Sequence, residues 1–201
     1  NKFAKLSEIE LIKGSGVDMN IFKYRKLDID NKKIIFPARL LFDKGVKDFL
    51  ESSEILSKEY PDWKFILAGA LDYKNPTIIP KKILDKYLLN KNIQCLGYVN
   101  NMQDIFTDSA IVCLPSYREG MPKALLEAAA IGRAIVTTLT IGCKESIVDN
   151  LTGLLVPVKD TQSLTAALRK LIDSPTLRSS FGLNGRKFAE DNFDLRKVQN
   201  R

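Results

Sequence analysis

The sequence predicts an α/β fold in which a doubly wound, Rossmann-like parallel sheet carries helices on both faces. Short apolar runs that are typical of buried strands alternate about six times with segments of helical periodicity. At 201 residues with 45% hydrophobic content, the chain can bury one substantial core. No internal repeat, low-complexity segment or linker interrupts the alternation. We therefore expect a single domain over residues 1–201.

The first half of the chain supplies alternating strands and helices. A strand candidate at residues 8–12 and a polar connection precede the first central strand, which we predict at residues 33–38. Asp43 is expected to cap the following helix, because apolar residues recur after it at helical spacing. The next predicted elements are a strand at residues 63–68, a helix at 83–89, a strand at 93–96 and a short helix at 102–107.

A strand, a loop and a helix follow at the centre of the predicted sheet. The apolar run at residues 110–114 gives way to a polar loop that ends at Gly120. Pro122 suits the first position of a helix, and residues 124–131 are rich in helix formers before Gly132 stops them. The start of such a helix offers unpaired N–H groups and partial positive charge, which suit a phosphate.

The last third continues the same alternation. Residues 134–137 and 153–156 are β-prone and predict two further strands. Asp160 is expected to cap one helix, and Ser174 followed by Pro175 is expected to open another.

Composition excludes several classes of site. The chain has no histidine, and its three cysteines, Cys95, Cys113 and Cys143, are far apart, so a zinc site and a histidine-based triad are excluded within it. Unpaired cysteines favour a reduced, cytosolic protein. No apolar run approaches the roughly 20 residues of a membrane span. The net charge of +7 is dispersed without a basic and aromatic run, which disfavours nucleic acid as a partner.

Two cations lie where a ligand is expected. Ligands of an open parallel sheet bind beyond the carboxyl ends of the strands, and Arg39 and Lys44 follow the first central strand. Such a pair can neutralise a diphosphate, because arginine binds through a bidentate fork and lysine as a compact charge. The alternative is ordinary surface basicity, which is common in a chain with 31 Lys and Arg residues.

Two acids frame the loop and helix at the centre of the sheet. Glu119 lies in the loop, and Glu127 lies about a turn and a half inside the predicted helix. A solvated surface acid is the ordinary role of a glutamate on a helix. Leu126 and Ala128 flank Glu127 in a helix that is apolar nearly all round, so an acid there needs a partner.

The order of these residues resembles the retaining glycosyltransferases of family 4. The resemblance rests on Glu119-Gly120-Met121-Pro122 followed by Leu126-Glu127-Ala128, Gly132 and a strand, and it covers about residues 8–195. Residues 38–45, ARLLFDKG, resemble the phosphate-binding stretch of the same family. The resemblance implies the GT-B fold, in which two Rossmann-like domains face a cleft, and it makes this chain the C-terminal, donor-binding half.

The resemblance also implies roles for individual residues. Arg39, Lys44 and Glu119 would be catalytic, the first two by stabilising charge on the leaving diphosphate and the third by addressing the donor sugar. Glu127 would hold the ribose hydroxyls. The donor would also contact Gly14, Ser15, Gly16, Leu71, Tyr98, Val99, Gly120, Met121 and Pro122, with no metal. Asp18 would hold the glycine loop rather than touch substrate. On the residues alone, that loop is interpreted as a turn, and a packed aromatic is an equal alternative for Tyr98.

The chain departs from the family in the stretch after residue 137. Many relatives carry an aspartate where this chain has Leu139 and a proline where it has Ile141. Either the chain supports its loop in another way, or its activity is altered. Cys143, two residues further on, is expected to be structural, because no base lies near it in sequence.

The predicted function is transfer of a sugar from a UDP-, GDP- or ADP-sugar, without a further cofactor, to a glycan or lipid-linked acceptor in cell-surface polysaccharide synthesis. The acceptor would be bound by an N-terminal domain absent from this chain, so the isolated domain is expected to be inactive. We expect a cytoplasmic protein whose full-length form makes a peripheral contact with the inner face of the membrane. Two alternatives stay open, a non-enzymatic nucleotide-binding module and a sugar-nucleotide epimerase of GT-B fold.

Overall fold

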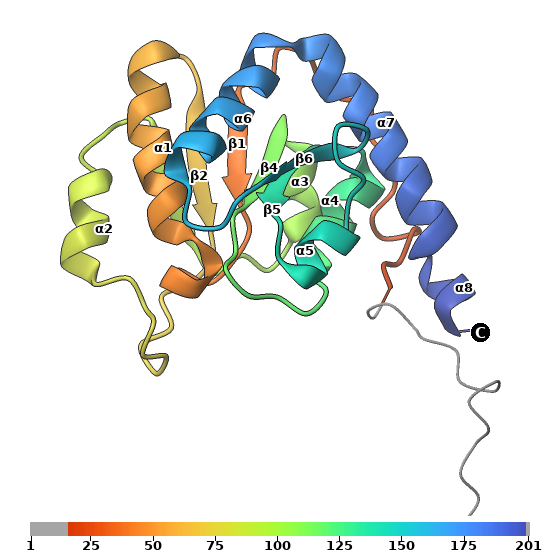
Figure 1. Ribbon diagram of the computed structural model, residues 1–201, viewed down its shortest axis with the longest axis horizontal. Coiled ribbons are helices and arrows are strands. Elements are labelled where there is room, and N and C mark those ends of the chain that lie inside the picture. The colour runs from red at the N-terminus through yellow and green to blue at the C-terminus, as the bar shows by residue number, and fades with distance from the viewer. Residues whose placement is uncertain (1–15, 200–201) are drawn as a thin grey trace, which may run out of the picture.

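A parallel sheet organises the computed structural model, which describes residues 16–199 (Figure 1). Within that range its strands are β1 (Lys33–Phe36), β2 (Lys64–Ala68), β3 (Ile93–Gly97), β4 (Ile111–Leu114), β5 (Ala134–Thr138) and β6 (Gly153–Val156). Their order across the sheet is β3-β2-β1-β4-β5-β6, and each neighbouring pair is parallel. The order reverses between β1 and β4, which confirms the doubly wound sheet. The strand predicted at residues 8–12 lies outside the described residues.

Helices occupy the connections between the strands. They are the 3-10 turn η2 (Phe42–Lys44) and the α-helices α1 (Val46–Glu59), α2 (Lys81–Tyr87), α3 (Met102–Thr107), α4 (Lys123–Ile131), α5 (Ile141–Glu145), α6 (Thr161–Asp173), α7 (Pro175–Asn192) and α8 (Leu195–Gln199). The crossover from β1 to β2 contains α1, and the crossover from β4 to β5, which runs in the opposite direction across the sheet, contains α4. Because such crossovers are right-handed, α1 and α4 lie on opposite faces. Helix α6 packs against α1, and α7 packs against α4 (Figure 1). None of the helices within residues 16–199 combines the length and apolarity that crossing a membrane requires.

The two faces of the sheet bury different amounts of apolar surface near β1. Ile34 and Phe36 point into the large core, whereas the intervening Ile35 joins Ile66 and Ala68 in a small separate cluster. Alternation of side chains along a strand explains the division. The partly buried residues packed against the small cluster are Val99, Met102 and Ile105.

Two predicted helix caps are confirmed. The Asp160 carboxylate accepts a hydrogen bond from the Ser163 N–H at 2.8 Å and begins α6. The Ser174 hydroxyl accepts from the Leu177 N–H at 3.2 Å, and Pro175 follows as the first residue of α7. Each cap satisfies one of the N–H groups that a helix start leaves without a partner.

The predicted cap at Asp43 is wrong. Asp43 lies inside η2, and α1 begins after Gly45, which has a φ of 74° and provides no side-chain cap. A Cβ at Gly45 would lie 2.0 Å from the Pro115 carbonyl oxygen. The chain therefore turns through a left-handed glycine pressed against the loop after β4, and this contact, which is remote in sequence, delays the helix.

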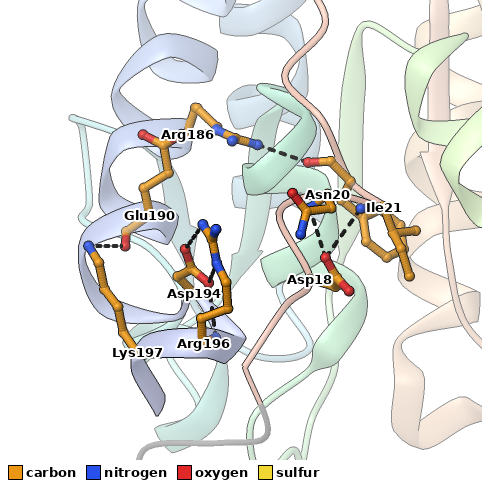
Figure 2. Close-up of polar contacts among 9 residues, drawn as sticks. Asp18, Asn20, Ile21, Arg186, Glu190, Asp194, Arg196 and Lys197 are labelled. Carbon is orange, nitrogen blue, oxygen red and sulfur yellow. Dashed lines mark hydrogen bonds and ion pairs between the residues drawn. The ribbon is translucent and has the colours of Figure 1, made fainter. Parts of the chain in front are cut away.

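The start and the end of the described chain lie side by side. Val17 pairs with Asp194 in a parallel bridge, with the Val17 N–H donating to the Phe193 carbonyl at 2.8 Å. Figure 2 shows the Asp18 carboxylate accepting hydrogen bonds from the N–H groups of Asn20, at 2.8 Å, and Ile21. Asp18 thus holds the turn that follows it, whereas the preceding glycine loop, which we predicted it to hold, lies partly outside the described residues.

Candidate functional site

A cavity of about 420 Å³ opens at the carboxyl ends of β1, β2 and β3. Four predicted site residues, Arg39, Leu71, Tyr98 and Val99, line it. They arrive from three separate loops, each directly after a strand, because parallel strands bring their carboxyl ends to one edge of the sheet. Its wall is mostly apolar, and Tyr98 exposes 77% of its surface, so Tyr98 is not a packed core aromatic.

An ion pair lies at this cavity. The Arg39 Nη1 atom donates to Asp72 Oδ2 at 2.6 Å, and both residues line the cavity. The Arg39 side chain is 56% exposed and the Asp72 side chain 27% exposed. Sequence analysis gave the neighbouring Leu71 a donor contact but assigned no role to Asp72. Its position in the loop that follows β2 was the available signal.

A second ion pair, between Lys44 and Glu119, joins η2 to the loop after β4. The Lys44 Nζ atom lies 2.5 Å from Glu119 Oε1, and the Ser116 hydroxyl donates to the same oxygen at 3.1 Å. Both charged side chains are largely buried. The two loops are also joined by a hydrogen bond from the Tyr117 N–H to the Asp43 carbonyl at 2.8 Å. Lys44 and Glu119 do not line the 420 Å³ cavity.

Helix α4 begins beside the cavity. Pro122 is its N-cap residue, in an extended conformation, and Lys123 is its first helical residue, one later than we predicted for the proline. No side chain caps this start, and Ala124 from the first turn lines the cavity. The uncapped N–H groups therefore lie at the cavity edge, where they suit an anion. Gly120 and Met121 lead into this helix but do not line the cavity.

Glu127 is buried on α4, as its apolar neighbours predicted. The residue is 9% exposed, and its carboxylate forms an ion pair with Lys123 Nζ at 3.6 Å. Burial raises the pKa of Glu127 above its ordinary value, and the Lys123 charge only partly opposes this shift. A buried acid with one exposed and distant cation has acceptor capacity left for a ligand hydroxyl.

The glycine loop near the start of the chain is described only in part. Gly14 and Ser15 lie outside the described residues. Gly16 lies beside Phe193 and Leu195 at the joint between the chain ends, and it does not line the cavity. The structure therefore brings Arg39, Leu71, Tyr98 and Val99 together but places Gly16 at another point.

The stretch after β5 packs on the loop that carries Glu119. A Cβ at Gly142 would lie 1.1 Å from the Gly120 carbonyl oxygen, so the two backbones are in direct contact. Leu139 and Ile141, which precede this contact, are 56% and 73% exposed. Cys143 is fully buried, which agrees with a structural role.

The chemistry available at this edge is that of cations, carboxylates and backbone N–H groups. Among residues 16–199, no three Cys, Asp or Glu side chains gather as a metal site would require. Arg39, Lys44 and the start of α4 supply positive charge, and Asp72, Glu119 and Glu127 supply acceptors. Such an arrangement suits a ligand with a flat apolar group, hydroxyls and phosphates.

Curated proteins similar to this chain include glycosyltransferases. The capsular polysaccharide biosynthesis glycosyltransferase CapM of Staphylococcus aureus is 28% identical over 85% of this chain and 44% of its own length. The N,N'-diacetylbacillosaminyl-diphospho-undecaprenol alpha-1,3-N-acetylgalactosaminyltransferase of Campylobacter jejuni is 33% identical over 80% of this chain and 41% of its own length. The chain thus spans less than half the length of these relatives.

Solved structures share the fold. The C-terminal domain of the group 1 glycosyl transferase LpcC from Francisella tularensis is 26% identical, with a TM-score of 0.76 over 90% of this chain and all of that domain. Anabaena HepE in complex with UDP and glucose is 18% identical, with a TM-score of 0.80 over 92% of this chain and 53% of HepE. The fold is therefore one Rossmann-like half of a GT-B glycosyltransferase.

Family membership follows from the sequence itself. Residues 19–188 match the family described as glycosyl transferases group 1, and this segment includes the cavity and both ion pairs. Because the match covers more than half of the chain, this protein belongs to the glycosyl transferases group 1 family.

Proposed function

We propose that this chain is the C-terminal, nucleotide-sugar-binding domain of a retaining glycosyltransferase of family 4. The observation that carries the proposal is the cavity at the carboxyl ends of β1, β2 and β3, which the Arg39–Asp72 pair and the uncapped start of α4 border. An apolar wall beside a cation and free N–H groups suits a nucleoside diphosphate. The UDP in the HepE structure supports this class of ligand.

The proposed donor runs from the cavity toward the loop after β4. Its nucleobase would lie against Tyr98 and Val99, and Glu127 would accept hydrogen bonds from the ribose hydroxyls. The diphosphate would lie between Arg39 and Lys44. The sugar would then extend toward Glu119 and the backbone of residues 120–122, with the leaving diphosphate stabilised by fixed positive charge instead of a metal.

Lys44 and Glu119 neutralise one another in an ion pair. Because both side chains are largely buried, the pair keeps a charged lysine in place before the diphosphate arrives. Entry of the diphosphate would let Lys44 share its three N–H donors between Glu119 and a phosphate oxygen. Glu119 would then be held near the sugar by the same lysine that holds the leaving group.

We also propose how this domain takes part in a larger enzyme. An N-terminal domain would bind a glycan or lipid-linked acceptor, and the isolated chain would have little transferase activity. The names of the relatives support cell-surface polysaccharide synthesis and a lipid-linked acceptor. An enzyme acting on such acceptors would work in the cytoplasm, against the inner face of the membrane.

Calorimetric titration with UDP, GDP and ADP tests the donor proposal. We expect one of the three to bind the 201-residue chain, and its affinity to fall about 10-fold or more for Arg39→Ala and for Lys44→Ala, because each variant loses a charged hydrogen bond. Binding should weaken in high salt. If none of the three binds, the donor proposal is wrong, and a non-enzymatic interaction module becomes the better hypothesis.

The stereochemistry of the product tests the reaction class. The full-length protein, given the nucleotide sugar identified by titration and an acceptor, should form a product with the same anomeric configuration as the donor. An inverted product would refute retention. Interconversion of the nucleotide sugar without an acceptor would favour the epimerase.

A further inference from the structure

The two loops that carry Arg39 and Asp72 form one bonded wall of the cavity. The Leu40 N–H donates to the Ala70 carbonyl at 3.0 Å, and the Phe42 N–H donates to the Thr77 carbonyl at 2.7 Å. The Ile79 N–H donates back to the Leu40 carbonyl at 3.0 Å. The loop after β1 and the loop after β2 therefore cannot separate without losing several backbone hydrogen bonds.

A close backbone contact holds the two loops together where they leave β1 and β2. A Cβ at Gly69 would lie 1.8 Å from the Ala38 carbonyl oxygen, so only glycine allows the two strand ends to approach this closely. Ala38 and Gly69 both line the cavity. The distance between the backbones of Arg39 and Asp72 is thus set by packing, before their side chains meet.

The Asp72 carboxylate is held at both oxygens. Its Oδ1 accepts a hydrogen bond from the Lys74 N–H at 3.2 Å, in a turn that the Asn75 N–H closes by donating to the Asp72 carbonyl at 3.0 Å. Its Oδ2 accepts from Arg39 Nη1 at 2.6 Å. The turn orients the carboxylate independently of the arginine, so the arginine meets a fixed acceptor.

We propose that Asp72 is a positioning residue, which holds Arg39 over the cavity so that the arginine meets the diphosphate of the ligand. This role rests on the proposed function. Asp72 receives one N–H of a guanidinium that has five, and the Arg39 side chain is 56% exposed, so donors remain for phosphate oxygens. A free arginine has large rotamer freedom, and holding it beforehand lowers the entropy lost on binding.

Two other roles for Asp72 predict different behaviour. If Asp72 contacted the nucleobase directly, its loss would weaken a nucleoside as much as the corresponding diphosphate. If Asp72 competed with phosphate for Arg39, its loss would strengthen diphosphate binding. If Asp72 is a positioning residue, its loss weakens binding of the diphosphate but not of the nucleoside, and only while Arg39 is present.

The test compares a diphosphate with its nucleoside across a double-mutant cycle. Wild-type chain, Asp72→Asn, Asp72→Ala, Arg39→Ala and the double variant are titrated with whichever of UDP, GDP and ADP binds, and with uridine, guanosine or adenosine to match. Calorimetry measures the diphosphate and ligand-observed NMR the nucleoside. Asp85→Ala, on the surface of α2 and paired with Lys81, is the control for loss of one negative charge.

We expect Asp72→Ala to weaken diphosphate binding about 5-fold to 10-fold and to leave nucleoside binding unchanged within about 2-fold. Asp72→Asn keeps an oxygen that can accept the hydrogen bond of the turn, so its diphosphate affinity should lie between those of wild type and Asp72→Ala. This intermediate value separates a positioning role from misfolding. In the Arg39→Ala background, loss of Asp72 should weaken diphosphate binding by less than about 2-fold, because the arginine that Asp72 positions is gone. The Asp85→Ala control should bind like wild type.

Three results would overturn this role while leaving the proposed function in place. They are equal weakening of nucleoside and diphosphate, tighter diphosphate binding by either Asp72 variant, and effects of Asp72→Ala and Arg39→Ala that simply add. Failure of the wild-type chain to bind UDP, GDP and ADP would instead overturn the proposed function, and the role of Asp72 with it.

Discussion

Replacing Gly142 with alanine should displace the loop that carries Glu119. A Cβ at this position would lie 1.1 Å from the Gly120 carbonyl oxygen, 2.2 Å from its carbon and 2.9 Å from the Glu119 carbonyl oxygen. All three atoms belong to the backbone, so no side-chain rotation can relieve the clash. The loop and the start of α5 must move apart by about 2 Å to reach an ordinary contact.

The cost of this movement can be estimated from overpacking in other proteins. Added methyl groups in well-packed sites typically cost about 1–3 kcal/mol, and a clash with backbone belongs at the upper end of that range. For a chain of this size, about 3 kcal/mol corresponds to a fall of roughly 6–12 °C in the melting temperature. The displaced loop also carries Glu119, so nucleotide binding should weaken about 10-fold or more through a shift of the site.

Thermal unfolding and nucleotide titration measure the two effects. Gly185→Ala in α7 is the matched control, because its Cβ would meet atoms only at 3.8 Å or beyond, an ordinary van der Waals distance. Alanine inside a helix should stabilise Gly185→Ala by about 0.5–1 kcal/mol. If Gly142→Ala melted like wild type and bound nucleotide normally, the contact between the two loops would not position the site.

Three further substitutions test the charges of the site and the core. Glu127→Gln should stabilise the chain at pH 7, because burial raises the pKa of Glu127 and the charged carboxylate therefore lowers the free energy of unfolding above pH 4.5. Thermal melts should show this gain in stability disappearing below pH 4.5, and calorimetry should show nucleotide binding weakened about 10-fold. Lys44→Met should destabilise the chain by about 1–3 kcal/mol in urea unfolding, since it leaves Glu119 largely buried without its cation, and adding Glu119→Gln should recover part of the loss. Arg133→Met should lower the free energy of unfolding by about 3 kcal/mol or more in the same assay, because three carbonyl groups lose their donor. A decrease of less than about 1 kcal/mol would show that water replaces the guanidinium as the donor.

Local signals were sufficient to predict most elements of the fold. The short helix at residues 102–107 and the strand at 153–156 begin and end as predicted, and the caps at Asp160 and Ser174 hold. In each case the determining residues are neighbours in sequence. Four of the residues that line the cavity, Arg39, Leu71, Tyr98 and Val99, were named from the sequence. The topology of a parallel sheet predicted Arg39, and the family resemblance implied the other three.

Features that depend on contacts between distant segments were not predictable. Asp43 has the sequence of a helix cap, but the approach of Gly45 to Pro115 moves the helix start beyond it. The pairing of Arg39 with Asp72 joins residues 33 positions apart, and nothing in the local sequence of either specifies the other. Sequence patterns therefore identified some of the side chains that line the cavity, but they assigned no role to Asp72 and did not specify its pairing with Arg39.

The basic composition of the chain also has a structural origin that its sequence did not reveal. Arg133, Arg178 and Arg186 are buried or nearly buried, and each donates to one backbone carbonyl of the irregular segment before β1. These carbonyls belong to Arg25, Ile29 and Phe22, respectively. A segment without strand or helix partners leaves carbonyl groups that need donors, and guanidinium groups supply several donors at once.

Part of the net charge of +7 therefore serves the fold rather than a partner. Burial lowers the pKa of Arg133 to about 10 and lowers the pKa of Arg178, which shows that these cations are held at a cost that their hydrogen bonds must offset. Arg39 differs from them, because most of its side chain is exposed and it lines a cavity. Exposure beside a cavity, and not the number of basic residues, is what distinguishes a cation available to a phosphate from one that holds the backbone.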